Sequence, residues 1–212
     1  SGICSTDGKR IETVIDNRLI GSENTKISDS DEKCINDAYF NKCQNIGYFF
    51  PRQNNVHVMT KSRQGKWSDL SCNTDSVLYT GQYNTIWIDH GQNPKEESYA
   101  YTVVPDCSAE EFRDYCAANK TETLENSARV QCVRKGGCVG AAFLTNGSAS
   151  AGGIAVSDKC IAMLKTDESI LNFVLCDPTQ KQKQIEVELA YSAEEVSFCD
   201  DRINILQLAP HI

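Results

Sequence analysis

The sequence has no apolar run that approaches the ~20 residues of a membrane-spanning helix. It is also poor in basic residues: 21 Lys and Arg stand against 29 Asp and Glu, which gives a formal net charge of -8. A chain with this charge is repelled by a nucleic-acid backbone unless a local basic patch overrides the average. We therefore expect neither a membrane span nor nucleic acid as a partner.

Motifs for several common catalytic and metal sites are missing as well. The cysteines never form a C-x-x-C pair, so a zinc knuckle is not expected. No G-K-[ST] follows a glycine run, which argues against a phosphate-binding loop. The three histidines, His57, His90 and His211, are far apart in the chain and are expected to be structural or solvent-facing. We therefore predict no catalytic residue, no metal site and no cofactor in this chain.

Cysteine, in contrast, is abundant. Eleven cysteines are spread from one end of the chain to the other, and such a number is typical of proteins that fold in an oxidising compartment. Two N-x-[ST] triplets, which begin at Asn119 and Asn146, are candidate glycosylation sites, although such triplets also arise by chance. The composition thus predicts a secreted, extracellular glycoprotein stapled by disulfides.

The number of cysteines is odd, so at least one of them must be free or bonded to another chain. Cys4, near the start of the sequence, is our candidate for an interchain disulfide. Within the chain, Cys107 and Cys116 flank a predicted helix and are candidates for one bond. Cys160 and Cys176 are candidates for another, because both lie at the ends of predicted neighbouring strands.

Short β-prone runs alternate with turn residues along most of the chain. This rhythm is typical of an antiparallel β protein, because Gly, Pro and Asn end each run after a few residues. Paired glycines and a polar stretch near residues 120–137 separate two such β-rich regions. The clearest predicted strands in the first region are residues 56–60, 85–89 and 98–104.

One helix signal interrupts this pattern. Ser108 and Glu111 form a capping box, in which each side chain can bond the backbone amide of the other residue. The predicted helix runs to about Ala118. The fold class is therefore all-β: antiparallel β-sandwich domains with one short helix. We expect a first sandwich over residues 1–120, a linker over 121–137 and a small C-terminal sandwich over 138–212.

Several short motifs, taken in order, carry a family resemblance. Each is unspecific alone, but the ordered set covers most of the chain and resembles the β-sheet portions of the hyaluronate and chondroitin lyases, polysaccharide lyase family eight. The motifs are TVIDNR from Thr13, GYFFP from Gly47, NVHV from Asn55, GKWSD from Gly65, IDHGQNP from Ile88, SYAY from Ser98, VP from Val104, DPTQ from Asp177 and IEVEL from Ile185.

The resemblance implies the later part of the large central β-sandwich followed by the C-terminal β-sandwich. In that family the reactive groups lie on a preceding helical toroid: an asparagine neutralises the uronate carboxylate, and a tyrosine and a histidine handle the C5 proton and the leaving oxygen. Nothing in this sequence resembles a series of long amphipathic helices. The resemblance therefore carries no catalytic residue into this chain.

A sandwich that begins part-way through exposes apolar faces and unpaired strand edges. Either a second chain, which could be disulfide-linked, covers them, or this chain has rebuilt the missing half. Carbohydrate is the other candidate partner, because aromatic rings stack on the apolar faces of sugars. The candidate carbohydrate-binding residues are Trp67, Tyr99 and Tyr101, although a tryptophan in a sandwich is more often part of the core.

Two functions follow from these observations. The first is a secreted, disulfide-rich, non-catalytic binding or assembly protein on a lyase-derived scaffold, with carbohydrate or a partner chain as its target. The second is the processed C-terminal chain of a polysaccharide lyase that cleaves uronate-containing glycans by β-elimination, with its catalytic residues on another chain. Recruitment of the scaffold to unrelated chemistry is a third alternative, because a fold does not fix its function.

Overall fold

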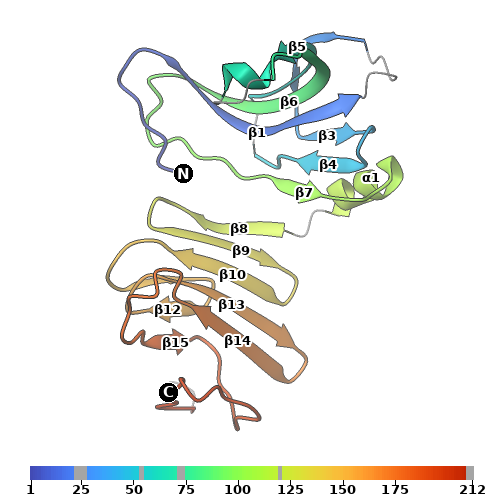
Figure 1. The fold of residues 1–212 in the computed structure, drawn as a ribbon. Helices are drawn as coiled ribbons and strands as arrows, with labels where there is room; N and C mark the ends of the chain where they lie inside the picture. Colours follow the sequence, from blue (N-terminus) through green and yellow to red (C-terminus); the bar gives the residue numbers. More distant parts are fainter. Residues whose placement is uncertain (22–27, 53–54, 71–74, 119–120, 209–212) are drawn as a thin grey trace. The chain divides into compact units, whose positions relative to one another are not determined.

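The structure, a computed structural model, describes residues 1–21, 28–52, 55–70, 75–118 and 121–208 (Figure 1). It divides into two compact units, Ser1–Asn119 and Lys120–Ile212. All strand pairs between the named strands are antiparallel, which confirms the predicted all-β class. Among the described residues, no helix is long and apolar enough to span a bilayer.

The first unit contains a four-stranded sheet of order β1-β6-β5-β2 and a three-stranded sheet of order β3-β4-β7 (Figure 1). A single 3-10 turn, Trp67–Asp69, follows β5. The strands are β1 (Arg10–Gly21), β2 (Ser30–Ile35), β3 (Ala38–Asn41), β4 (Ile46–Phe49), β5 (Val56–Gly65), β6 (Tyr79–Gln92) and β7 (Thr102–Val104).

The apolar residues that alternate with polar ones in residues 56–60 predicted a strand, and their side chains fill the core of the first unit. Val56 and Val58 of β5 lie opposite Ile88 and Ile86 of β6, so their side chains share one face of the sheet. All four are buried in one cluster, which Tyr48 and Phe50 complete from the segment at β4. Phe50 is fully buried.

The predicted capping box is confirmed at the helix α1 (Ala109–Ala118). The backbone N–H of Glu111 donates to Ser108 Oγ over 3.2 Å, and the backbone N–H of Ser108 donates to Glu111 Oε2 over 2.8 Å. The helix buries Phe112 against the sheet. A Cβ at Gly47 would overlap the Phe112 ring, so the glycine that opens the GYFFP motif lets helix and strand approach closely.

The second unit is a sandwich of a five-stranded sheet, order β14-β13-β10-β9-β8, and a three-stranded sheet, order β11-β12-β15 (Figure 1). Its strands are β8 (Thr121–Asn126), β9 (Val130–Lys135), β10 (Cys138–Phe143), β11 (Ala149–Ala151), β12 (Ile154–Val156), β13 (Cys160–Asp167), β14 (Ile170–Cys176) and β15 (Val187–Leu189).

The stretch expected as a linker, residues 121–137, contains two strands of this five-stranded sheet. β8 and β9 pair with each other, and β9 also pairs with β10. The polar composition that suggested a linker has a structural reason. β8 is an edge strand, and in β8 and β9 mainly alternate side chains face the core, so the others can be polar. Val130 and Cys132 are buried, while Gln131 and Val133, which alternate with them, are exposed.

The expected disulfide stapling is not found: no disulfide joins any two of the ten described cysteines. Cys160 faces the core of the second unit, whereas Cys176 is opposite the outward-facing Ile161. The two thiols therefore lie on opposite faces of one sheet, where no bond can form. Cys107 and Cys116 pack in the same cluster, but the Cys107 thiol donates to the Val104 carbonyl over 3.3 Å.

Buried cysteines behave here as small apolar side chains. Cys132 and Cys160 are each 1% exposed and fill the sandwich core beside Ala141 and Ala162. Burial raises the pKa of the Cys160 thiol to about 11, and it also raises the pKa of Cys132. Packing therefore explains these positions without any cross-link.

Candidate functional site

Four aromatic rings, those of Phe50, Tyr101, Tyr99 and His90, form a ladder near the last residues of β6. Phe50 in the core lies 6.0 Å from Tyr101, measured between ring centroids, and Tyr101 lies 6.2 Å from Tyr99 at an interplanar angle of 24°. Tyr99 then contacts His90, with the ring centroids 6.1 Å apart. Phe50 is fully buried and Tyr101 is 38% exposed, so the ladder leads from the core to the surface. The structure thus brings together Tyr99 and Tyr101, two of the three candidate carbohydrate-binding residues.

The polar side chains beside the ladder have defined partners. His90 Nε2 lies 2.8 Å from Thr13 Oγ1, and Arg10 donates to Asp89 over 2.9 Å. The Arg10 hydrogen bond, with a further bond from the backbone N–H of Gly91, holds the pKa of Asp89 below its ordinary value. Asp89 and His90 are therefore engaged with different partners and do not form a base with its orienting carboxylate.

His57 sits on the opposite face of the four-stranded sheet from the core. Its ring stacks on Trp87 with the centroids 5.4 Å apart and the planes 16° apart. His57 Nδ1 lies 2.8 Å from Glu32 Oε1 on β2. Trp87 is only 7% exposed. Both faces of β6 are therefore covered at this point, and Trp87 is a packing residue rather than a sugar platform.

Trp67, the remaining candidate for sugar stacking, is not part of the ladder. Trp67 follows Gly65, which pairs with Tyr79, the first residue of β6. Tyr99 instead contacts His90, near the last residue of that strand. A strand of 14 residues separates these ends by on the order of 40 Å. Trp67 is 55% exposed and begins a 3-10 turn, so it is not part of the core.

A partly buried contact joins two of the motifs that carried the family resemblance. Tyr48 of GYFFP donates its hydroxyl to the Asp16 carboxylate of TVIDNR, and Arg18 Nε donates to the same carboxylate over 2.5 Å. Burial, together with the Asp16 charge, raises the pKa of Tyr48, which therefore stays protonated as a donor. Sequence reasoning missed this contact, although both motifs were visible in the sequence.

The comparisons with known proteins match both units. The family model described as the polysaccharide lyase family 8 super-sandwich domain matches residues 1–116. The model for the C-terminal β-sandwich domain of the same family matches residues 122–186. The chain belongs to polysaccharide lyase family 8.

Individual relatives support the same family assignment. A xanthan lyase from Bacillus sp. (strain GL1) is 33% identical over the whole chain, and a hyaluronate lyase of Enterococcus faecalis is 29% identical over 89% of it. The structure of a Paenibacillus xanthan lyase superposes with a TM-score of 0.89 at 28% identity over 99% of the chain. The chondroitin AC lyase of Streptomyces coelicolor has the same fold, with a TM-score of 0.85 at 23% identity over 98% of this chain and 27% of its own.

The chain spans only a fraction of these lyases. It covers 25% of the Bacillus xanthan lyase, 20% of the Enterococcus enzyme and 22% of the Paenibacillus chain. The match is therefore to the sheet portion of the family. Within the described residues, no group of three or more His, Cys, Asp and Glu side chains is placed to hold a metal ion.

The DPTQ motif of this family member is a turn held by one carboxylate. Asp177 accepts the backbone N–H groups of Thr179, Lys181 and Gln182 over 2.8 to 2.9 Å, and also the Thr179 hydroxyl. These bonds, the one from Gln182 foremost, lower the pKa of Asp177 to about 2. The motif is thus a scaffold element that fixes the turn after β14.

The remaining predicted positions lie at the surface or outside the described residues. Cys4 is exposed, and its sulfur accepts the backbone N–H of Glu96 over 3.3 Å. Asn146 is exposed in a bend between β10 and β11, where a glycan could attach. Asn119 and His211 lie outside the described residues.

Proposed function

We propose that this chain is a non-catalytic binding and assembly scaffold of the polysaccharide lyase type, and that the Tyr99–Tyr101 ladder contacts glycan. The match of both units to the sheet domains of family 8 carries the proposal. The relatives that match over the same residues are named as lyases of xanthan and hyaluronate. Uronate-containing polysaccharides are therefore the ligands to test first.

The ladder supplies the contact that a sugar ring needs. An aromatic face buries the C–H face of a sugar without a polar cost, and stacked rings hold one another in position. Tyr101 is 38% exposed and rests on Phe50 and Tyr99, so its ring is fixed before a glycan arrives. Preorganisation of this kind reduces the entropy that binding costs.

Binding of soluble xanthan, hyaluronan and chondroitin sulfate to the purified chain tests the proposal. We expect retardation in affinity electrophoresis with at least one of them. Replacing the exposed ring, Tyr101→Ala, should weaken binding by about tenfold. Tyr79→Ala is the matched control, because Tyr79 is 49% exposed at the opposite end of β6. Equal loss in both variants, or no retardation with any of the three, would contradict the proposal.

The second candidate function is the C-terminal part of a polysaccharide lyase whose reactive groups lie on another chain. It is favoured by the coverage of the relatives, of which this chain matches about a quarter or less of the length. β-Elimination creates an unsaturated uronate that absorbs in the ultraviolet. If the chain is a non-catalytic scaffold, the isolated chain forms no unsaturated uronate. Product from the native complex but not from the isolated chain would favour the second candidate.

We also propose an extracellular location and a partner chain bonded through Cys4. The N-x-[ST] triplets at Asn119 and Asn146 support the compartment, and the exposure of Cys4 supports the bond. The intact mass of native protein before and after reduction tests both. We expect a loss of mass on reduction that Cys4→Ser abolishes. An unchanged mass would remove the interchain bond from the proposal.

A further inference from the structure

The outward face of the five-stranded sheet carries an unusual number of apolar side chains. A row directly across four strands consists of Val133, Gly140, Met163 and Val174, each opposite the next in register. Val133, Met163 and Val174 are 47%, 48% and 56% exposed. Since the other face of the sheet packs on the small sheet, this outer row is not part of the unit's own core. A contiguous exposed apolar patch of this kind marks an interaction surface.

Gly140 makes the middle of this row hollow. A Cβ built there would meet only one atom within 4 Å, Val133 Cγ2 at 4.0 Å, so the space above the glycine is open. The hollow lies between the side chains of Val133 and Met163, its neighbours in the row. It is a shallow apolar depression in a flat sheet, and a single large side chain could occupy it.

The hollow has cations on one side. Lys165 lies two residues beyond Met163 on β13 and therefore shares its face, about 7 Å away. Lys135 on β9 belongs to the same cross-strand row as Lys165, with Cys138 between them. An occupant that fits this surface has an exposed apolar side chain with an acidic group close behind it.

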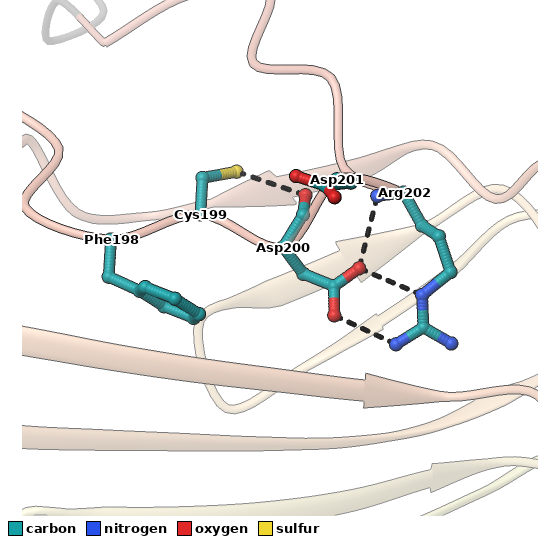
Figure 2. A pocket seen from close by; sticks show the side chains of 5 residues that line it. All are labelled: Phe198, Cys199, Asp200, Asp201 and Arg202. Atoms are coloured by element: carbon teal, nitrogen blue, oxygen red, sulfur yellow. Dashed lines mark hydrogen bonds and ion pairs between the residues drawn. The ribbon is translucent and has the colours of Figure 1, made fainter.

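The chain itself carries such a segment after β15. Residues 193–208, here named the tail loop, are closed by a bond from the Ala193 N–H to the Leu208 carbonyl over 3.4 Å. At its turn, the Ile203 N–H donates to the Asp200 carbonyl over 2.9 Å. Phe198 is 86% exposed just before this turn. Figure 2 shows its ring beside the hollowed turn of residues 198–202.

The turn is ordered by its own ion pair and is acidic. Both carboxylate oxygens of Asp200 accept bonds from the Arg202 guanidinium over 2.8 Å, as Figure 2 shows. Asp201 beside them supplies a second carboxylate, and Glu194 and Glu195 lie at the base of the loop. The tail loop thus offers an exposed phenyl ring followed within three residues by Asp201.

We propose that the tail loop of one copy of this chain docks on the outer sheet face of a second copy, with Phe198 over Gly140 and Asp201 beside Lys165. In this arrangement the phenyl ring of Phe198 meets the apolar hollow, and the negative charge of Asp201 meets the positive charge of Lys165. Within one copy the loop follows β15, which belongs to the small sheet on the opposite side of the sandwich. The contact therefore joins different copies, and it is heterologous, since two different surfaces meet.

Sedimentation velocity of the full 212-residue chain over a range of concentrations tests this contact. We expect the average mass to rise with concentration. Phe198→Asp and Met163→Glu should each weaken association by at least about 30-fold, because each removes an apolar group from the centre of the interface. Leu70→Asp is the control: Leu70 is 80% exposed in the first unit and should not affect the mass.

Charge reversal tests the register of the contact. Lys165→Glu and Asp201→Lys should each weaken association by about threefold, since both charges are solvent-accessible. The double variant restores an opposite-charge pair in every interface and should recover most of the loss. A chain that sediments as a monomer at all concentrations would overturn the proposal, as would a double variant with the full sum of both losses. Circular dichroism of each variant checks that the fold is kept.

Discussion

The two units differ in the side chains that they bury between or beside their sheets. Every buried polar side chain of the described residues, Asn41, Thr60, Asn84 and Thr85, lies in the first unit. The core of the second unit consists mostly of aliphatic and small groups, with Phe143, 2% exposed, as its buried ring. Polar contacts with defined partners specify a unique arrangement, whereas small residues let two sheets approach closely. Replacing a buried polar side chain should therefore lower the stability of the first unit, whereas the second unit has no such side chain among the described residues.

The largest expected effect is in the aromatic core of the first unit. Phe50→Ala should lower its free energy of unfolding by about 3–5 kcal/mol, because it leaves a cavity under Tyr101. Urea unfolding followed by tryptophan emission reports this unit alone, since Trp67 and Trp87 are the two tryptophans of the chain. Leu164→Ala in the other core is the control. A shift of the tryptophan transition by that variant would show that the units unfold together.

The buried polar network should respond less strongly. Asn84 donates through Nδ2 to the Tyr39 hydroxyl over 3.0 Å and to Thr60 Oγ1 over 3.3 Å. Asn84→Ala leaves both groups without this donor and should cost about 1–3 kcal/mol. Asn172→Ala is the matched control, since Asn172 is exposed on β14 of the second unit. Equal losses in urea unfolding followed by circular dichroism, which reports both units, would contradict the contrast between the units.

The capping box of α1 should contribute about 1 kcal/mol to stability, the usual value of an N-cap hydroxyl. Ser108→Ala removes the acceptor of the Glu111 N–H, and faster hydrogen exchange of this amide is the measurement. Ser108→Asp keeps an acceptor at the same position and should preserve protection. If both variants exchange alike, the cap does not hold the first turn.

The smallest effect is a pH dependence in the second unit. The folded pKa of Asp177 is about 2, below its ordinary 3.8, so the ionised form stabilises the fold. This contribution is complete above the ordinary pKa and is lost as the pH falls from there to about 2. Urea midpoints by circular dichroism should show this loss, and Asp177→Asn should remove it. Asp167→Asn is the control; a loss of the acid dependence in this variant would assign it to another carboxylate.

Sequence reasoning succeeded where the signal was local. The period of two in residues 56–60 and 85–89 predicted strands, and the pair Ser108 and Glu111 predicted the helix start. It failed at residues 121–137, because polar edge strands and linkers have similar composition. It also failed for Cys160 with Cys176, since neighbouring strand ends do not reveal which face each thiol occupies.

For this protein the sequence by itself determined the strand class, the helix cap and the family resemblance, because each is encoded in a few adjacent residues or in their order. Only the tertiary structure decided that Tyr48 bonds Asp16, that Tyr101 contacts Tyr99 rather than Trp67 and that buried cysteines remain thiols. Those facts depend on the register between strands that are far apart in the chain. A shift of register by one residue would exchange the buried and exposed faces of a strand.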